Sequence, residues 1–322
     1  MRRRTFLKAT AAGLCTSALM QNAPVHAAPK KQLIIDTHQH LWDLSWQKLP
    51  WLADDSPLAR NFVTSDYLEA TAGEDVRAVY MEVDVTANQK RAEAEHVVNL
   101  SRDKAKPTVA AVVGGDPGLE GFADYVKFLS AFPEVKGVRQ VLHGTRPQGK
   151  CLQPAFVKSV QLLGERNLSF DLCMRSTDIG DGVKLAKQSP DTRFVLDHCG
   201  NMDPKAFLDS SDENQKSIAQ WKRDVAALAN VPNTICKISG VIASVPGMAT
   251  AEVLAPVVNH CLESFGPERV VFGGDWPVCL NGAPLATWLS VLREIISNRP
   301  EKEQRCLWSE NAIRFYGLKD VV

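Results

Sequence analysis

The sequence lacks several features that assign proteins to common classes. Its 37 basic and 37 acidic residues leave no excess charge of either sign, so we expect neither a nucleic-acid partner nor attraction to an anionic membrane surface. No apolar run approaches the ~20 residues that span a bilayer. The sequence also contains no internal repeat, no Cys-x-x-Cys pair, no zinc-finger spacing and no Gly-rich phosphate loop after an early strand. These absences disfavour repeat, zinc-finger and dinucleotide-binding proteins.

The N-terminus has the pattern of a twin-arginine export signal. Arg3-Arg4-Thr5-Phe6-Leu7-Lys8 precedes a mildly apolar stretch, and Val25-His26-Ala27 offers small residues for cleavage. The alternative is a basic N-terminus without a targeting role. We expect residues 1–27 to be a signal peptide that sends the protein to the periplasm. Residues 28–322, which number 322 − 27 = 295, would form one catalytic domain.

Cysteine usage favours free thiols over a disulfide framework. Seven cysteines follow residue 27, and both their odd number and their scattered spacing argue against a disulfide framework. An exported protein is permitted disulfides. Several of these cysteines, however, lie in apolar, strand-like runs, where buried thiols are common.

Strand-like and helix-like segments alternate along the chain. Continuous apolar runs of this kind are typical of parallel strands that are buried on both faces. The expected strands are Leu33–His38, Arg77–Val83, Thr108–Gly114, Val135–Val141, Leu168–Met174, Arg193–His198, Thr234–Ser239 and Val270–Asp275. Eight such units in one chain predict an α/β fold, a single-domain (β/α)8 TIM barrel. A doubly wound open sheet is the main alternative.

The first connection after a strand, roughly 41–64, is unusually long and rich in aromatic residues. It contains Trp42, Trp46, Trp51 and Phe62. Long loops of this kind are often functional. Two interpretations remain open: the aromatic side chains form a wall for the substrate over the barrel mouth, or they only pack the loop onto the barrel.

Polar residues gather at the expected carboxyl ends of the strands, where barrel enzymes place their catalytic groups. His38 and His40 are two residues apart and should project from the same face of the first strand, with Asp275 at the end of the last. The other polar residues at these ends are Glu82, Asp84, Arg139, His143, Asp171, Arg175, His198, Lys237 and Ser239. Four of the six histidines beyond residue 27 are in this set, which indicates a functional site.

Two acidic residues near these ends allow further interpretation. Glu82 interrupts an apolar strand, and a buried carboxylate needs a partner or a metal. It is either the ion-pair partner of Arg139 or Arg175, or part of the catalytic or metal site. Asp197 precedes His198 and, by strand alternation, should point away from the barrel interior towards the helices, which gives it a structural role.

Seven ordered motifs resemble the lactonase-type branch of the amidohydrolase superfamily, the branch of L-fuconolactonase and 2-pyrone-4,6-dicarboxylate lactonase. The motifs are Ile35–Asp43, Gly137–Arg139, Phe170–Leu172, Phe194–His198, Cys236–Gly240, Val271–Cys279 and Asn311–Tyr316. The resemblance implies a hydrolase that opens a lactone, that of a sugar acid in our interpretation. Two alternatives stay open: a metal-dependent decarboxylase of the same superfamily, and a barrel that binds a sugar acid without catalysis.

The resemblance also implies roles for individual residues. Asp275 would be the base that activates water, assisted by His198. His38, His40, His198 and Asp275, with Glu82 as a weaker candidate, would hold one divalent metal, zinc being the expected ion, or the histidines would polarise the lactone carbonyl without a metal. No lysine suited to bridging two metals ends the fourth strand, so a mononuclear site or none is expected. The expected substrate contacts are His143, Arg139, Arg175, Trp42 and Trp51. The expected partner is a small lactone or sugar acid, and the oligomeric state stays open.

Overall fold

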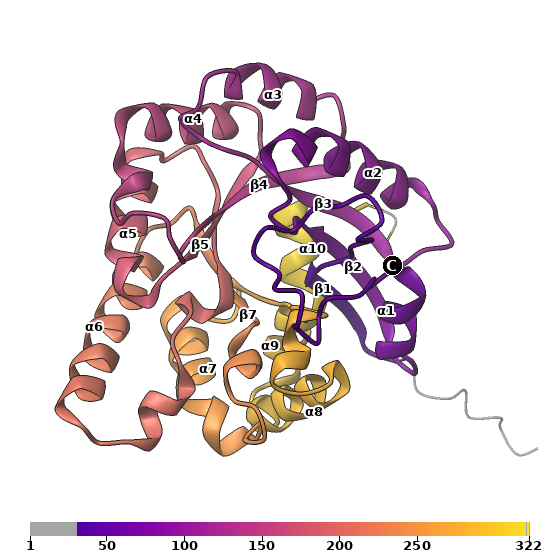
Figure 1. The fold of residues 1–322 in the computed structure, drawn as a ribbon. Helices are drawn as coiled ribbons and strands as arrows, with labels where there is room; N and C mark the ends of the chain where they lie inside the picture. Colours follow the sequence, from indigo (N-terminus) through magenta and orange to yellow (C-terminus); the bar gives the residue numbers. More distant parts are fainter. Residues whose placement is uncertain (1–30, 320, 322) are drawn as a thin grey trace, which may run out of the picture. The chain divides into compact units, whose positions relative to one another are not determined.

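The computed structural model describes residues 31–319 and residue 321. The predicted signal segment, residues 1–27, lies outside these described residues. Eight parallel strands form one sheet in chain order, with each strand paired to the next (Figure 1). They are β1 Leu33–Gln39, β2 Asp75–Met81, β3 Thr108–Gly114, β4 Val135–Leu142, β5 Ser169–Met174, β6 Phe194–Leu196, β7 Thr234–Ile238 and β8 Val270–Phe272. The predicted (β/α)8 barrel is confirmed.

Among the strands that end earlier than predicted, β6 and β8 do so at the candidate site. β6 stops at Leu196 rather than His198, and β8 stops at Phe272 rather than Asp275. The physical reason is the backbone, because His198 and Asp275 both adopt φ of 53°, which no strand accommodates. The chain therefore turns sharply where the sequence pattern predicts continued strand.

Side chains and backbone together close the ring between β1 and β8. The Thr37 hydroxyl donates to the carbonyl of Phe272 at 2.7 Å, and Gln39 forms an isolated parallel bridge with Trp276. Buried Asp36 accepts hydrogen bonds from the Gly274 amide at 2.7 Å and from the Tyr67 hydroxyl at 2.8 Å. These contacts bring the end of the last strand beside the two histidines of the first.

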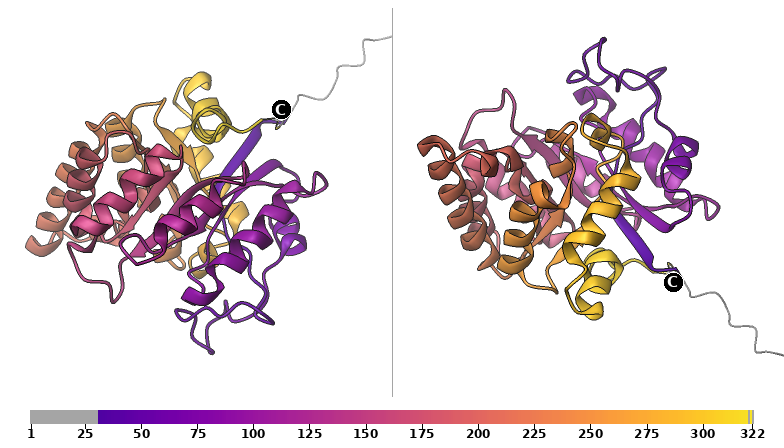
Figure 2. Two further views of the ribbon diagram at one scale, coloured as in Figure 1. Left: turned by 90° about the horizontal axis from the view of Figure 1, so that it is seen from above. Right: turned by 90° about the horizontal axis from the view of Figure 1, so that it is seen from below.

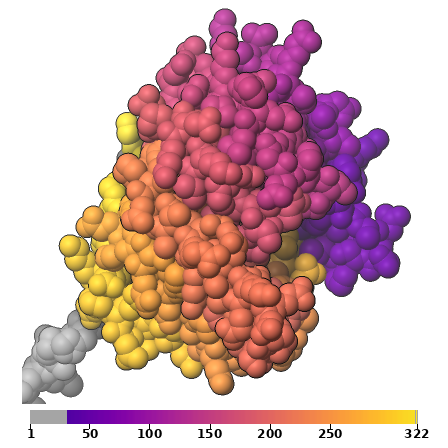
Figure 3. Space-filling model, turned by 90° about the vertical axis from the view of Figure 1, so that its left-hand side faces the viewer, coloured from indigo at the N-terminus to yellow at the C-terminus, as the bar shows by residue number. Residues whose placement is uncertain are grey.

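Helices alternate with the strands and lie outside them, as the views in Figure 2 show. They are α1 Thr64–Ala70, α2 Lys90–Arg102, α3 Phe122–Leu129, α4 Pro154–Glu165, α5 Ile179–Gln188, α6 Asp212–Ala229, α7 Ala251–Phe265, α8 Leu285–Ile296, α9 Glu301–Arg305 and α10 Asn311–Tyr316. Figure 3 shows the outer surface formed by helices of the middle of the chain. None of the helices in the described part of the chain combines the length and apolar character needed to cross a membrane.

Apolar side chains of the strands alternate between two cores. Ile34 belongs to the larger core between strands and helices, whereas Ile35 belongs to a second core inside the barrel. The inner core also receives Tyr316 and Leu318 from the C-terminal segment around α10, which is seen through the ring of strands in Figure 1. These layers fill one end of the barrel interior and leave the carboxyl ends of the strands for polar groups.

The long connection between β1 and α1 is held down by its own aromatic residues. Trp42 is buried, pairs through its backbone with Phe62 and donates its indole N–H to the carbonyl of Arg60 at 2.7 Å. Trp51 packs edge-on against Trp42 and donates to the carbonyl of Val83 at 2.7 Å. Trp42 thus packs the loop onto the barrel.

Candidate active site

The structure brings together His38 of β1, His40 directly after this strand, and the aspartate that follows β8. Nε2 of His40 lies 3.4 Å from Oδ1 of Asp275, and Nε2 of His38 lies 3.7 Å from the same oxygen. One ligand atom from each of the three residues lies within 4.8 Å of the others. His198 joins them from the end of β6, its ring centroid 4.4 Å from that of His38. All four predicted residues therefore converge.

Hydrogen bonds hold the imidazoles in defined orientations. Nδ1 of His40 lies 3.0 Å from the carbonyl of Met81, an acceptor, so this nitrogen carries the proton and Nε2 keeps its lone pair towards Asp275. Nδ1 of His198 lies 2.9 Å from the hydroxyl of Ser239. Partners of this kind fix the tautomer and ring orientation of a catalytic or metal-binding histidine.

Burial keeps two of the histidines uncharged. It lowers the pKa of His38 well below its usual range, an effect reinforced by the nearby charge of Lys237. Burial also lowers the pKa of His198, although the negative charge of Asp275 opposes the shift. Both rings are neutral at neutral pH and available as ligands or hydrogen-bonding groups.

The turn after β6 gives His198 its place. His198, Cys199 and Asn201 all have positive φ, between 52° and 53°, a conformation that is uncommon for residues other than glycine. Gly240 follows β7 at φ 71°, and a Cβ atom there would lie 2.3 Å from Nδ1 of His198. Only glycine permits this close approach.

A buried chain of charges lies beneath the histidines. Nε of Arg139 lies 2.6 Å from Oε1 of Glu82, and its Nη1 lies 3.6 Å from Oδ2 of Asp197. Nζ of Lys237 lies 2.9 Å from Oδ1 of Asp197 and 2.8 Å from Oδ2 of Asp171. Alternating signs along this chain compensate charges that would otherwise be costly to bury.

The two carboxyl groups that contact Lys237, those of Asp171 and Asp197, differ in pKa. Burial is the largest single influence on Asp197 and opposes its ionisation, but the interactions with Lys237, His198 and Arg139 together outweigh it, so the pKa falls to about 2. Burial raises the pKa of Asp171 to about 7, although the same lysine opposes the shift. Asp197 also faces Arg139, which explains why it is the ionised member of the pair.

The predicted orientation of Asp197 is wrong. Its side chain points into the barrel and contacts Lys237, Arg139 and, at 3.7 Å, Nδ1 of His38. Strand alternation fails here because β6 has already ended at Leu196 and the following backbone is left-handed from His198 onward. These ion pairs are compatible with the predicted structural role of Asp197, but its side chain lies on the opposite face of the chain from the one predicted.

A cavity of about 460 Å³ opens above the histidines at the carboxyl ends of the strands. Its lining includes His40, His198 and Asp275, together with Trp51, Arg139 and His143 of the expected substrate contacts. Burial lowers the pKa of His143 to about 4, so this ring is also neutral at neutral pH. The volume suits a small-molecule substrate.

Other residues proposed from sequence lie outside the lining of this cavity. Trp42 is buried in the loop packing described above. Arg175 donates to Oδ2 of Asp178 at 2.8 Å and to the carbonyl of Arg146 at 2.9 Å. Glu82 is the partner of Arg139, which was one of its two sequence interpretations. Substrate contact by Trp42 and Arg175 stays a prediction.

Several lining residues escaped the sequence reasoning. Asn201 and Asp203 follow β6, Ser244 follows β7, and Asp84, known only as a polar strand-end residue, projects into the cavity after β2. Only their position after a strand could have identified these residues from the sequence, since the loops that follow the strands build the active face of such a barrel. Side-chain direction in these irregular loops had no periodic pattern to predict it.

The donor set fits a divalent metal. His38, His40 and Asp275 offer two imidazoles and a carboxylate, the ligands that zinc prefers at catalytic sites. His38, Asp197 and His198 form a second overlapping group of possible ligand atoms. Both groups share His38, so they describe adjoining parts of one site.

A class of barrel hydrolases is defined by a parallel eight-stranded barrel with two histidines at the end of the first strand and an aspartate after the last. The comparison with known families agrees. Residues 35–318 match the amidohydrolase family, and the chain belongs to it. L-fucono-1,5-lactonase of Burkholderia multivorans is 27% identical over 297 residues, with 89% of this chain and 97% of the relative covered.

Two further relatives extend the comparison. L-rhamnono-gamma-lactonase of Scheffersomyces stipitis is 26% identical, and the match covers 89% of this chain and 99% of that protein. A crystal structure of an amidohydrolase from Burkholderia multivorans with bound Zn superposes with a TM-score of 0.78 at 23% identity, covering 89% of this chain and 100% of the other. The structural match supports the fold.

Proposed function

We propose that this protein hydrolyses the lactone of a sugar acid, with Asp275 as the base. The observation that supports this most directly is the meeting of His38, His40 and Asp275 within 4.8 Å beside the cavity. The two curated relatives named as lactonases of sugar acids support the same reaction class.

The charges of the cavity favour a neutral, polyhydroxylated substrate. Its lining residues include three carboxyl groups, those of Asp84, Asp203 and Asp275, and one guanidinium, that of Arg139. Arg139 directs Nε and Nη2 to the side chain and carbonyl of Glu82, at 2.6 and 2.8 Å, so its main partner is already in the protein. A lactone that carries free carboxylates would be repelled by these acidic residues, and the lining residues include no free cation to pair with it.

The reaction needs a nucleophilic water, stabilisation of the oxyanion and a proton for the leaving group. Asp275 takes a proton from water as the oxygen attacks the lactone carbonyl carbon. The bond from that carbon to the ring oxygen then breaks, and the ring oxygen takes the proton back from Asp275. The product carboxylic acid ionises, so each turnover releases one proton to solvent.

Zinc held by His38, His40 and Asp275 would polarise the carbonyl and lower the pKa of a water molecule. His198 lies beside His38, lines the cavity and would present a neutral ring to the developing oxyanion. Trp51, 43% exposed, forms an apolar wall, and His143 and Asn201 are placed for contacts with substrate hydroxyl groups. The crystal structure with bound Zn supports the proposed ion.

The test is proton release from a panel of aldonolactones by the wild-type protein and by Asp275→Asn, each with zinc or after chelation. We expect Asp275→Asn to lower kcat at least about 10³-fold, because the general base is lost. Asp124→Asn, an exposed change on α3, is the matched control and should retain activity. Lactone hydrolysis with equal rates in wild type and Asp275→Asn would refute the assignment of the base.

Two other outcomes would refute the function itself. Release of carbon dioxide from aromatic carboxylic acids, without lactone turnover, would identify a decarboxylase. Aldonolactone binding without turnover under any metal condition would identify a binding protein. Neither outcome depends on the identity of the ion.

We also propose that the chain is exported to the periplasm by the twin-arginine pathway. The support is the ordered Arg3-Arg4, apolar and small-residue pattern of the N-terminus. Replacing both arginines with lysines should leave the precursor in the cytoplasm, as cell fractionation and N-terminal sequencing would show. Unchanged export of the double variant would refute the proposal.

A further inference from the structure

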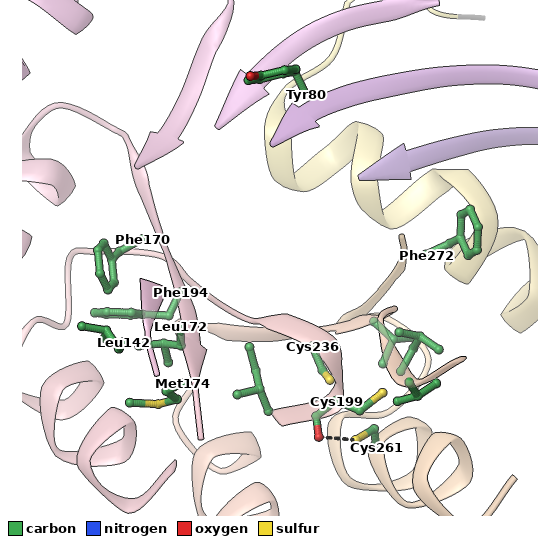
Figure 4. Close-up of a cluster of buried hydrophobic side chains, with 14 of the residues drawn as sticks. Tyr80, Leu142, Phe170, Leu172, Met174, Phe194, Cys199, Cys236, Cys261 and Phe272 are labelled. Atoms are coloured by element: carbon green, nitrogen blue, oxygen red, sulfur yellow. Dashed lines mark hydrogen bonds between the residues drawn. The ribbon is translucent and has the colours of Figure 1, made fainter. Parts of the chain in front are cut away.

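Three of the seven described cysteines meet at one place outside the candidate active site. Cys199 lies in the short 3-10 turn Asp197–Gly200, Cys236 in β7 and Cys261 in α7. Each residue is fully buried, and the three Sγ atoms all lie within 4.8 Å of one another. Figure 4 shows the side chains of Cys199, Cys236 and Cys261 gathered together. We call these residues the thiol cluster.

The thiols of the cluster have only weak partners. Sγ of Cys199 and Sγ of Cys236 both lie 3.9 Å from the carbonyl oxygen of Lys237. Sγ of Cys261 lies 3.9 Å from the carbonyl oxygen of Cys199, the contact drawn in Figure 4. The three thiols also hydrogen-bond to one another, and Cys199 has a hydrogen bond with the backbone of Ser239. A thiol is a weak donor and a weak acceptor, so a bound metal ion would replace weak contacts.

We propose that the thiol cluster binds one soft monovalent metal ion, Cu(I), through Cys199, Cys236 and Cys261. Thiolate sulfur is the donor that Cu(I) prefers. Metal–sulfur bonds of about 2.3 Å place three sulfurs around a trigonal ion about 4 Å apart, which falls within the 4.8 Å that encloses the three Sγ atoms. Zinc takes a fourth ligand at structural sites, and the described residues offer no fourth histidine, cysteine or carboxylate in this group.

Metal binding would join three elements that are distant in the chain. It would tie the end of β6 to β7 and α7, and it would do so at the residue next to His198. His198 and Cys199 occupy the same left-handed turn, so their side chains leave it in different directions, one to the cavity and the other to the thiol cluster. An ion on Cys199 therefore braces the turn that presents His198, and each thiol that binds as thiolate releases its proton to solvent.

The experiment offers Cu(I) to the protein without oxygen, in competition with bathocuproine disulfonate. The ion is given to the native protein and also during refolding from denaturant, because the buried thiols have no direct path to solvent. We expect one Cu(I) per chain, a sulfur-to-copper charge-transfer band in the ultraviolet and a higher Tm. This result does not depend on the lactonase proposal, since no readout is enzymatic.

Variants assign the ion to the thiol cluster. Cys261→Ala and Cys236→Ala each remove one sulfur and should weaken binding at least about 100-fold, as expected when a metal ligand is lost. Cys306→Ala removes a buried thiol elsewhere and is the matched control. His40→Asn tests binding at the histidines and should leave the charge-transfer band unchanged.

The proposal is overturned if neither route of loading retains copper, or if Cys261→Ala and Cys236→Ala bind it like wild type. Loss of copper in His40→Asn instead would assign it to the candidate active site. A protein isolated from its host with two of the three thiols oxidised to a disulfide, seen as a mass loss of two hydrogens, would also overturn it.

Discussion

The buried carboxyl group of Glu93 is expected to make the folded protein less stable as the pH rises towards neutral. Replacing Glu93 with glutamine should remove this loss of stability. Glu93 lies on α2 with no exposed surface. Its Oε1 accepts hydrogen bonds from the hydroxyl of Tyr80 at 2.8 Å and from the amide of Val83 at 2.9 Å. Its Oε2 has no hydrogen-bond partner. Burial, reinforced by the negative charge of Glu82, raises the pKa of Glu93 from 4.5 to about 7.

The sign and size of the effect follow from linkage. Below pH 4.5 the group is protonated in both states and has no effect on the pH dependence. Between pH 4.5 and 7 the unfolded chain ionises while the folded chain does not, so stability falls as the pH rises through this window. The interval of 7 − 4.5 = 2.5, at about 1.36 kcal/mol per pKa unit, gives an upper bound of about 3.4 kcal/mol.

Glutamine retains the Oε1 acceptor and cannot ionise, so Glu93→Gln should flatten this dependence. The measurement is urea unfolding of wild type and variant from pH 5 to 8, followed by fluorescence and circular dichroism together. The variant should gain about 1–3 kcal/mol relative to wild type across this range. Glu95→Gln, an exposed change on the same helix, is the control and should follow the wild type. Parallel pH profiles for wild type and Glu93→Gln would refute the reasoning.

Three other substitutions test the packing and the charge network. Lys237→Met leaves Asp171 and Asp197 buried without their cation, so thermal unfolding should show a loss of about 3–5 kcal/mol; an unchanged Tm would contradict the ion-pair account. Trp42→Ala should cost about 3–5 kcal/mol in urea unfolding, because its side chain is buried in the loop packing. Trp51→Ala should instead raise KM for the lactone with a much smaller change in Tm, and the reverse pattern for the two tryptophans would show that their roles are exchanged.

The barrel was predictable because its pattern is local. Each buried strand is a short apolar run, and eight such runs alternate with amphipathic stretches, so the architecture follows from periodicity and chain length. His38 and His40 follow from strand alternation, and Asp275 from the rule that catalytic groups gather at strand ends. Apolar runs also predicted buried free thiols for several of the cysteines, and the structure has all seven described cysteines buried and free.

The errors arose where the backbone leaves regular structure. Alternation predicts one direction for Asp197 only if β6 continues through His198, and the strand ends at Leu196. The choice of Glu82 as partner for Arg139 joins residues 57 positions apart, a contact that no spacing in the sequence encodes. The separate roles of Trp42 and Trp51 depend on how one long loop folds back over the barrel.

The sequence by itself determined the class of fold, the family resemblance and the residues available for chemistry, because strand periodicity and strand-end position are properties of short segments. Only the tertiary structure decided which charges pair, which aromatic residue faces the cavity and which thiols meet. Those contacts join segments far apart in the chain, and their geometry is set by ring closure and by left-handed turns at His198 and Asp275. Local pattern places a side chain at a strand end, but packing in three dimensions determines what it faces.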